Sequence, residues 1–305
     1  MRIFNIAITL TAALAAALTA TTAMAAPKKV LFFSKSSGFE HDVIKVQNGQ
    51  PSLVDKLLKE IGATNNIEFT CTKDGTIFTP ENIAKFDAFM FYTTGDLTVP
   101  GADKNPPMPK EAKAQLLDAI RNGKGFIGTH SACDTFHTVE DPSIGPGYHN
   151  DGDKTDPYIQ MIGGEFIMHG GGQAHFQPGR MIVVDKAFPG ISGLPEDFAP
   201  VEEWYSMKNF QPNLHVLLIQ DTSTMMKAMG GACYDRPNYP ATWSSAYGKG
   251  RVFYTSMGHR AEVWNDPMFQ QILIGGLKWA VGDATGDTTP NINKVTPQAS
   301  ALPPK

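Results

Sequence analysis

Two histidines stand where they could take part in acid–base or metal-dependent chemistry. His130 follows a short apolar run at 125–128, and His259 follows a second apolar run at 251–256. Gly128 leaves room for a sharp turn after the first run, which would present His130 at the carboxyl end of a buried strand. Ligands of open α/β sheets bind at that edge. We therefore predict that His130 and His259 are functional residues.

Two further side chains complete a candidate cluster. His41 lies in the loop after the first predicted strand, and Glu203 lies in a polar and aromatic segment. If the strands are parallel neighbours, His41, Glu203 and the two strand-end histidines gather over one edge of the sheet. Three imidazoles and a carboxylate suit a divalent transition metal such as zinc, with an open position for water, and the tentative ligands are His41, His130 and His259. Without a metal, the same set suits acid–base catalysis, because imidazole titrates near neutral pH.

Other side chains are candidates for contact with a ligand. His169 and His175 flank a glycine run whose backbone freedom suits a closing loop, although the run could equally be a bend. Tyr205 and Trp243 could stack on a sugar ring, but aromatic side chains are more often buried. His215, inside an apolar strand, is expected to be a core histidine.

The elements that must position these residues alternate between strand and helix patterns. Strands are predicted at 28–34, 67–71, 86–94 and within 124–133, and helices at 51–61, from 79 and at 111–121. This alternation is typical of a parallel sheet with helices on both faces. It is lost in a polar excursion at 134–179, and we expect the part of this excursion at 134–175 to cover the pocket and set substrate choice. Later strands are predicted at 180–185, 215–220, 240–245 and 251–256, with a tight turn at 247–250 and a closing helix at 268–281.

The two ends of the chain differ from its centre. Residues 1–25 are predicted to be a cleaved export signal, with Arg2, an apolar core and the small-x-small site Ala-Met-Ala. The mature protein would then be periplasmic or secreted, without a membrane span. The polar, proline-containing tail at 283–305 is predicted to be disordered. Loss of Arg2 would move the formal net charge from −4 to −5, and this mild acidity without a basic stripe argues against a nucleic-acid partner.

The three cysteines do not form a disulfide framework, because their number is odd and their spacing is wide. A single disulfide bridge is possible in an oxidising compartment. No Cys-x-x-Cys is present, which argues against a thiolate zinc site. Cys133 lies close to the turn after Gly128 and could be a nucleophile. A free cysteine is, however, more often a small buried hydrophobe.

Several motifs taken together resemble the ThuA (trehalose-utilisation) family. They are Gly-Thr-His-Ser-Ala at 128–132, Gly-Gly-Glu-Phe at 163–166 followed by His169, Glu203-x-Tyr205, and Gly-Lys-Gly-Arg-Val-Phe-Tyr-Thr-Ser-Met-Gly-His at 248–259. The resemblance covers about 28–282 as one domain. It implies an α/β fold of the class I glutamine amidotransferase-like type, a flavodoxin-like three-layer sandwich with a mostly parallel central sheet.

The sequence departs from the amidotransferases of that superfamily at two places. Their elbow after a strand presents a cysteine, whereas here His130, and not Cys133, stands at the nucleophile position. Their late strand ends in His-x-Glu, whereas here the motif is His259-x-x-Glu262, one residue longer. Both departures argue against glutamine hydrolysis.

The resemblance implies a role in carbohydrate metabolism, on disaccharides or their keto-sugar derivatives. It carries His130, His259, Glu203, His41 and Tyr205 over as pocket residues. The leading hypothesis is a sugar hydrolase, lyase or isomerase that uses this pocket for proton transfer or metal-assisted chemistry. The alternative is a non-catalytic sugar-binding or accessory subunit beside a partner sugar dehydrogenase or hydrolase, and either could be a homo-oligomer. The third hypothesis is a thiol hydrolase that acts through Cys133.

Overall fold

The computed structural model describes residues 25–139 and 149–304. The predicted export signal therefore lies, except for residue 25, outside the described residues, as does the part of the polar excursion at 140–148. In the described part of the chain, no helix combines the length and apolar character needed to cross a membrane.

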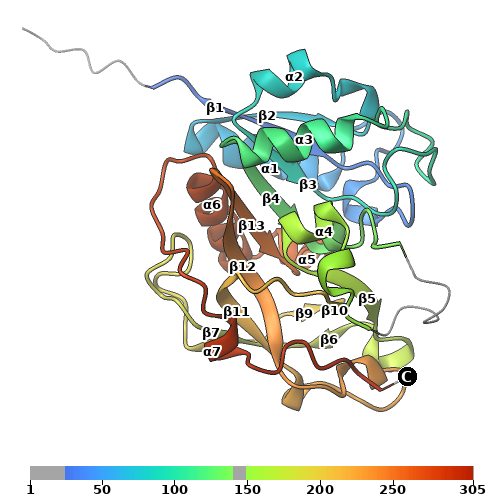
Figure 1. Cartoon of the computed structure of the whole chain (residues 1–305), viewed down its shortest axis with the longest axis vertical. Coiled ribbons are helices and arrows are strands. Elements are labelled where there is room, and N and C mark those ends of the chain that lie inside the picture. Colours follow the sequence, from blue (N-terminus) through green and yellow to red (C-terminus); the bar gives the residue numbers. More distant parts are fainter. Residues whose placement is uncertain (1–24, 140–148, 305) are drawn as a thin grey trace, which may run out of the picture.

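A nine-stranded mixed sheet forms the centre of the molecule (Figure 1). In spatial order its strands are β2 (Ile67–Thr72), β1 (Lys28–Phe33), β3 (Ala88–Phe91), β4 (Gly125–Thr129), β13 (Gly250–Thr255), β12 (Tyr239–Tyr247), β11 (His215–Asp221), β7 (Arg180–Val183) and β8 (Asp197–Phe198). Neighbours from β2 to β13 pair parallel, and neighbours from β13 to β8 pair antiparallel.

The prediction of a mostly parallel sheet is correct only for the first half of the strand order. The turn predicted at 247–250 is present, and it joins β12 to β13 as an antiparallel hairpin in which Tyr247 pairs with Gly250. A two-residue connection can only reverse the chain direction, whereas a parallel neighbour needs a long crossover. The strands that follow β12 in the sheet then continue antiparallel.

Helices cover both faces of the sheet. One face packs against α1 (Leu53–Asn65), α5 (Ala261–Trp264) and α6 (Pro267–Ala280), and the other against α2 (Pro80–Lys85), α3 (Ala112–Arg121), α4 (Pro157–Ile162) and α7 (Ile292–Val295). Successive residues of β4 serve the two cores, since Phe126 joins one and Ile127 the other. This alternation explains why the strand reads as a continuous apolar run.

Two short ribbons lie outside the main sheet and carry residues of the predicted site. β5 (Glu165–His169) pairs with β10 (Tyr205–Lys208), and β6 (Gln177–Pro178) pairs with β9 (Val201–Glu202). The polar excursion at 134–179 thus contains two short strands, β5 and β6, and both pair with strands that come later in the chain.

The C-terminal segment at 283–304 is packed against the sheet and is not disordered as predicted. The Asn291 side chain accepts a hydrogen bond from the Val216 backbone at 2.6 Å and donates one to its carbonyl at 3.1 Å. The buried Arg236 guanidinium donates to the carbonyl of Ala299 at 2.8 Å. A polar composition predicts disorder because the segment cannot bury itself, but here the rest of the fold supplies its partners.

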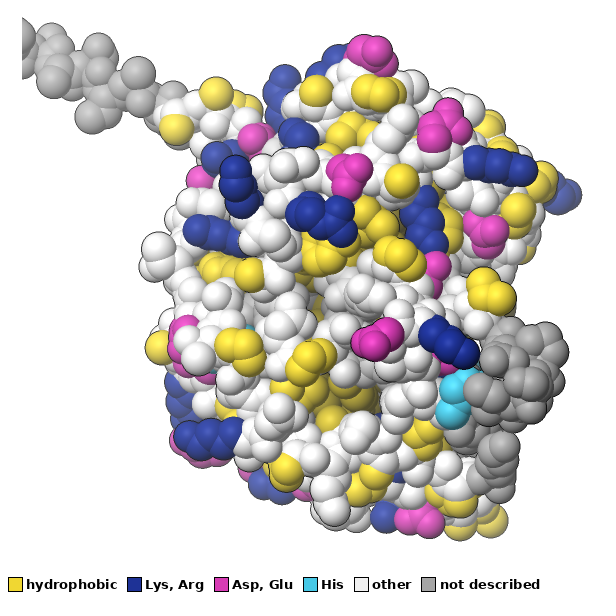
Figure 2. Space-filling model, in the orientation of Figure 1, with side chains coloured by type: hydrophobic (Ala, Val, Ile, Leu, Met, Phe, Trp, Pro, Cys, Tyr) yellow, Lys and Arg dark blue, Asp and Glu magenta, His cyan; other side chains and the backbone are white. Residues whose placement is uncertain are grey.

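Charged side chains are mixed on the face shown in Figure 2, where Lys and Arg alternate with Asp and Glu among the described residues. Such mixing produces no strong field of one sign over that face. It agrees with the small formal net charge of −4.

Candidate functional site

His130 stands at a sharp turn between β4 and the short 3-10 helix His130–Cys133. Its φ is +43°, a left-handed conformation that costs a non-glycine residue on the order of 1 kcal/mol or more. Gly128 makes the close packing at this turn possible, because a Cβ there would lie 2.9 Å from both Ile162 Cδ1 and Tyr254 Cδ2. The sharp turn predicted after Gly128 is therefore confirmed.

Three histidines converge from the loops that follow β1, β4 and β13, which lie parallel in the sheet. The ring centroids are 5.0 Å apart for His41 and His130, 4.9 Å for His41 and His259, and 5.1 Å for His130 and His259. His41 and His130 are buried, and the His259 side chain is 17% exposed. The structure thus brings together the three side chains predicted to meet at this edge.

Glu203, which follows β9, contacts this group through one carboxylate oxygen. Its Oε2 lies 2.9 Å from His259 Nδ1 and 3.3 Å from His130 Nε2, and these two nitrogens are 3.2 Å apart. Burial would raise the pKa of the Glu203 carboxyl, but the adjacent imidazoles of His130 and His259, when the nitrogens that face it are protonated, hold that pKa well below its usual range. Glu203 is therefore ionised at any ordinary pH.

A backbone carbonyl fixes the tautomer of His130. Its Nδ1 lies 3.0 Å from the carbonyl oxygen of Ser256, and a carbonyl can only accept, so Nδ1 carries the proton. In the neutral ring Nε2 then holds a lone pair that faces Glu203 and His259. A metal-binding histidine shows the same arrangement, since one nitrogen donates to the protein and the other binds the ion.

The positions of these atoms fit a small divalent cation. Tetrahedral zinc with bonds of about 2.0–2.1 Å separates its ligand atoms by roughly 3.3 Å, close to the 2.9–3.3 Å found among His130, His259 and Glu203. His41 can supply a fourth ligand, because one atom from each of the four side chains lies within 4.8 Å of the others. Nδ1 of His41 is buried and has no hydrogen-bond partner among the described residues.

His41 is also in the right protonation state for a ligand. Burial, and after it the neighbouring His130 and His259, lower its pKa well below the ordinary value. Its Nε2 lies 3.4 Å from the hydroxyl of Tyr205. The centroid of the Tyr205 ring lies 4.2 Å from that of His130, and Tyr205 is only 2% exposed. Tyr205 therefore packs against the buried side of the histidine cluster.

His169 and His175, predicted to contact a ligand, reach the other oxygen of Glu203. The Oε1 atom is 2.5 Å from His175 Nε2 and 3.6 Å from His169 Nε2. Their side chains are 37% and 39% exposed, so this side of the cluster is open to solvent.

Trp243, predicted to stack on a ligand, lies in the core instead. It is fully buried, its indole N–H donates to the carbonyl of Ile162 at 2.8 Å, and its ring stacks on Tyr254 at 4.3 Å. The prediction is corrected because the position of a tryptophan along the chain does not reveal which side of a strand it faces. His215, expected in the core, is buried and pairs with Asp185 at 3.0 Å.

Sequence reasoning missed several residues that hold the cluster in place. Glu202 is fully buried and accepts hydrogen bonds from the backbone N–H groups of Gly258 and Glu203, both at 3.0 Å. The Tyr92 hydroxyl donates to the carbonyl of Gly258 at 3.0 Å. The one available signal was position, since Glu202 adjoins Glu203 and Tyr92 lies near the end of the third predicted strand.

Phe176 was also missed. It is 43% exposed, and its ring lies 4.1 Å from that of His175 and 5.2 Å from that of His259. An exposed aromatic ring beside two histidines offers an apolar surface at the open side of the cluster.

The residues of an amidotransferase-type reaction are not available here. Cys133 is fully buried, and burial raises the pKa of its thiol. The Glu262 side chain is 71% exposed and pairs with Arg260 at 3.1 Å, away from the histidines. The structure thus gives no support to a thiol hydrolase.

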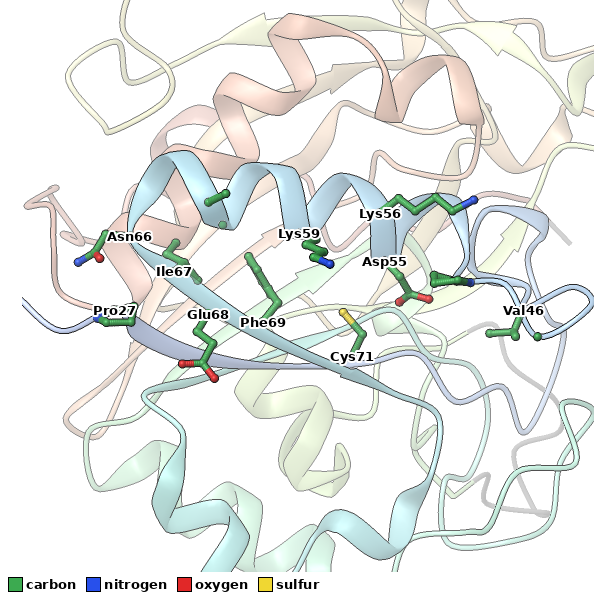
Figure 3. A pocket seen from close by; sticks show the side chains of 14 residues that line it. Pro27, Val46, Asp55, Lys56, Lys59, Asn66, Ile67, Glu68, Phe69 and Cys71 are labelled. Atoms are coloured by element: carbon green, nitrogen blue, oxygen red, sulfur yellow. The ribbon is translucent and has the colours of Figure 1, made fainter.

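A large groove lies elsewhere on the described part of the chain. It has a volume of about 910 Å³ and is lined by α1 and β2, with Asp55, Lys59 and Cys71 among its residues (Figure 3). Burial and then Asp55 raise the pKa of Cys71 to about 12, so the groove presents no thiolate. It shares no residue with the histidine cluster. We assign the candidate site from the convergence of titratable side chains, because size alone supplies no chemistry.

Comparisons with known proteins agree with this fold. A ThuA-like protein from Bacteroides uniformis is 19% identical, with a TM-score of 0.61 over 86% of this chain and 94% of that one. A ThuA-like protein from Parabacteroides merdae is 17% identical, with a TM-score of 0.53 over 92% of this chain and 98% of that one. No curated protein matches the sequence. The sequence model described as ThuA, trehalose utilisation, matches residues 29–280, and the chain therefore belongs to the ThuA family.

Proposed function

We propose that this protein is an exported carbohydrate-acting enzyme whose active site binds a divalent transition metal, such as zinc, through His41, His130, His259 and Glu203. The observation that carries the proposal is the tautomer of His130. Because its Nδ1 donates to Ser256, its Nε2 lone pair points at an ionised carboxylate 3.3 Å away. A cation between these atoms turns a repulsive contact into an attractive one.

A metal-free alternative places a second proton on His130. That proton would make an ion pair with Glu203, and the site would act by acid–base catalysis alone. It gives the His41 ring no part in the chemistry, however, whereas a metal ion would give that ring a role as the fourth ligand. We therefore favour the metal.

When bound, the metal would polarise a substrate oxygen or lower the pKa of a bound water. The chain's own residues have separate tasks. His169 and His175 are partly exposed and lie at the open side of the cluster beside Glu203, where they can contact a substrate. Phe176, which stacks on His175 and lies beside Arg260, offers a partly exposed apolar edge that a sugar ring can contact, and this supports a carbohydrate substrate of the kind that the family description suggests.

The finer fold assignment is likewise a proposal. The five parallel strands follow the order β2-β1-β3-β4-β13, which is the flavodoxin-like order with β13 as the fifth strand. This supports descent from a class I glutamine amidotransferase-like sandwich to which an antiparallel half has been added.

The proposal is tested by metal analysis and activity on the purified protein. We expect at least one equivalent of zinc or manganese per chain, lost in His130→Ala and His259→Ala together with turnover of disaccharide or keto-sugar substrates. His149→Gln is the matched control, because His149 also pairs with a carboxylate, Asp151 at 2.9 Å, but lies outside the cluster.

Two results would contradict the proposal. Absence of bound metal with normal turnover would leave only the acid–base mechanism. Sugar binding that is unaffected by chelation and by His130→Ala, without turnover, would instead identify a sugar-binding or accessory subunit.

A further inference from the structure

We infer that Glu203 bridges two metal ions, and that His169 and His175 bind the second ion. The inference rests on the proposed function, because the first ion is the one bound by His130 and His259. It assigns a metal-binding role to two histidines that sequence reasoning treated only as ligand contacts.

The two oxygens of Glu203 face two separate sets of histidines. Oε2 lies within 3.3 Å of both His130 and His259, whereas Oε1 lies near His175 and His169 at 2.5 Å and 3.6 Å. In each set, the nitrogens and the carboxylate oxygen lie within 4.8 Å of one another. A carboxylate has enough lone pairs to bind one ion with each oxygen.

The glycine run predicted as a closing loop is what brings the second pair of histidines together. His169 ends β5, and the 3-10 helix Gly172–Ala174 leads to His175, so the chain folds back within six residues. The turn is tight, because a Cβ on Gly170 would lie 2.4 Å from the carbonyl oxygen of Ala174. The two imidazole rings end 5.0 Å apart and nearly parallel.

Hydrogen bonds hold this loop in place and orient one of its rings. The Gly170 N–H donates to the Tyr234 hydroxyl at 2.8 Å, and the Gly171 N–H donates to the Gly230 carbonyl at 3.0 Å. His169 Nδ1 donates to the Gly170 carbonyl at 2.8 Å, so its Nε2 is left with a lone pair directed at Glu203. This is the arrangement already seen at His130.

The two halves of the centre differ in their access to solvent. The first ion would be bound by three buried side chains and by His259, which is 17% exposed, whereas the second would have three protein ligands, two of which are more than one-third exposed. Three ligands leave open positions for water or substrate oxygens. A pair of ions with open positions for water suits hydrolysis. Among the hydrolase, lyase and isomerase activities considered from the sequence, the inference therefore favours a hydrolase.

A simpler reading treats His175 only as a hydrogen-bond donor that orients Glu203. Substitution by glutamine separates the two readings, because glutamine keeps a donor and forms a poor site for zinc. His169→Gln/His175→Gln therefore removes the second site while retaining hydrogen bonding to Glu203. His149→Gln again serves as the control.

The test is metal stoichiometry on the full chain, saturated with zinc and then desalted. We expect two equivalents in the wild type and the control, and one in the double variant. Manganese-loaded protein should give an exchange-coupled electron paramagnetic resonance spectrum that changes to that of an isolated ion in the double variant. Circular dichroism checks that the variant is folded.

The other outcomes distinguish the two proposals. One equivalent in the wild type, unchanged in the double variant, overturns the second site and leaves the proposed function standing. Two equivalents retained by the folded double variant also overturn it. No metal in any form overturns both proposals. Loss of both ions from the folded double variant contradicts the inference, because His169 and His175 would then belong to the first site.

Discussion

Hydrogen bonds to backbone groups fix the position of one proton and of two side chains in the candidate site. The carbonyl oxygen of Ser256 fixes the proton of His130 on Nδ1, and the backbone N–H groups of Gly258 and Glu203 are both bound by the buried Glu202. These contacts hold Glu203 close to the Nε2 of His130, an arrangement that a shared proton or a bound cation would stabilise. The site would therefore be organised for the proposed cation before that cation binds, which would reduce the cost of ordering its ligands.

Gly128 is expected to be intolerant of even one methyl group. In Gly128→Ala the new Cβ would lie 2.9 Å from Ile162 and Tyr254, so the turn before His130 must shift. We expect a loss of about 1–3 kcal/mol in the free energy of unfolding, measured with urea. Gly171→Ala is the control, because nothing lies within 4 Å of a Cβ there. Equal urea midpoints for the two variants would contradict this account.

His137 should make stability depend on pH. Burial would lower its pKa, but hydrogen bonds to Asp134 and Glu165 raise it to about 9 from 6.5. Its contribution is therefore complete below pH 6.5 and is lost as the pH rises through about 9. Because the side chain is 39% exposed, we expect only about 1 kcal/mol.

The measurement compares the unfolding free energies of the wild type and His137→Gln at pH 6 and pH 9.5. The difference between them should be largest at pH 6 and should shrink at pH 9.5. A difference that stays constant across this range would show that the charge of His137 does not contribute to stability.

At the level of whole elements, the order of strands places the site. The loops after β1, β4 and β13 share one edge because those strands run parallel, so His41, His130 and His259 meet. Glu203 and His175 come from segments outside the main sheet: His175 precedes β6, and Glu203 lies between β9 and β10. Segments outside the parallel part of the sheet thus supply the carboxylate and a further histidine of the candidate site.

One side chain of the C-terminal segment, Asn291, makes two hydrogen bonds with the backbone of β11. Asn291→Ala removes both hydrogen bonds to Val216, and we expect a loss of about 1–2 kcal/mol. Amide hydrogen exchange should speed up at 291–301 and remain slow in β4 and β13. Asn293→Ala is the control, because Asn293 is exposed. Equal exchange rates in the two variants would show that other contacts hold the segment.

Across the whole molecule, the proposed metal joins segments that are far apart in the chain. His41, His130, Glu203 and His259 span more than two-thirds of the sequence. A ligand that binds only the folded state stabilises all the elements that carry these residues. The centre would therefore affect the cooperativity of unfolding as well as chemistry.

Chelation should consequently lower the melting temperature of the entire domain. Free zinc at about 100 times its Kd adds about 2.7 kcal/mol of stability, which corresponds to a shift of several degrees for a domain of this size. Calorimetry with zinc and with a chelator should show this shift for the wild type and His149→Gln. Glu203→Gln should show none, and an equal shift in that variant would place the zinc elsewhere.

The sequence by itself determined the local parts of this protein. Apolar periodicity predicted the strands and helices of the parallel half, and small residues predicted the turn that presents His130. The ThuA motifs predicted the family, which the match over residues 29–280 shows. Such features depend on neighbours along the chain, so they can be read without knowledge of the fold.

Only the tertiary structure decided which of these residues meet. It placed Trp243 in the core, ordered the C-terminal segment, reversed the second half of the sheet, and directed the two oxygens of Glu203 toward different histidines. The physical reason is that side-chain direction and the satisfaction of polar groups depend on contacts between distant segments. Local pattern does not contain that information.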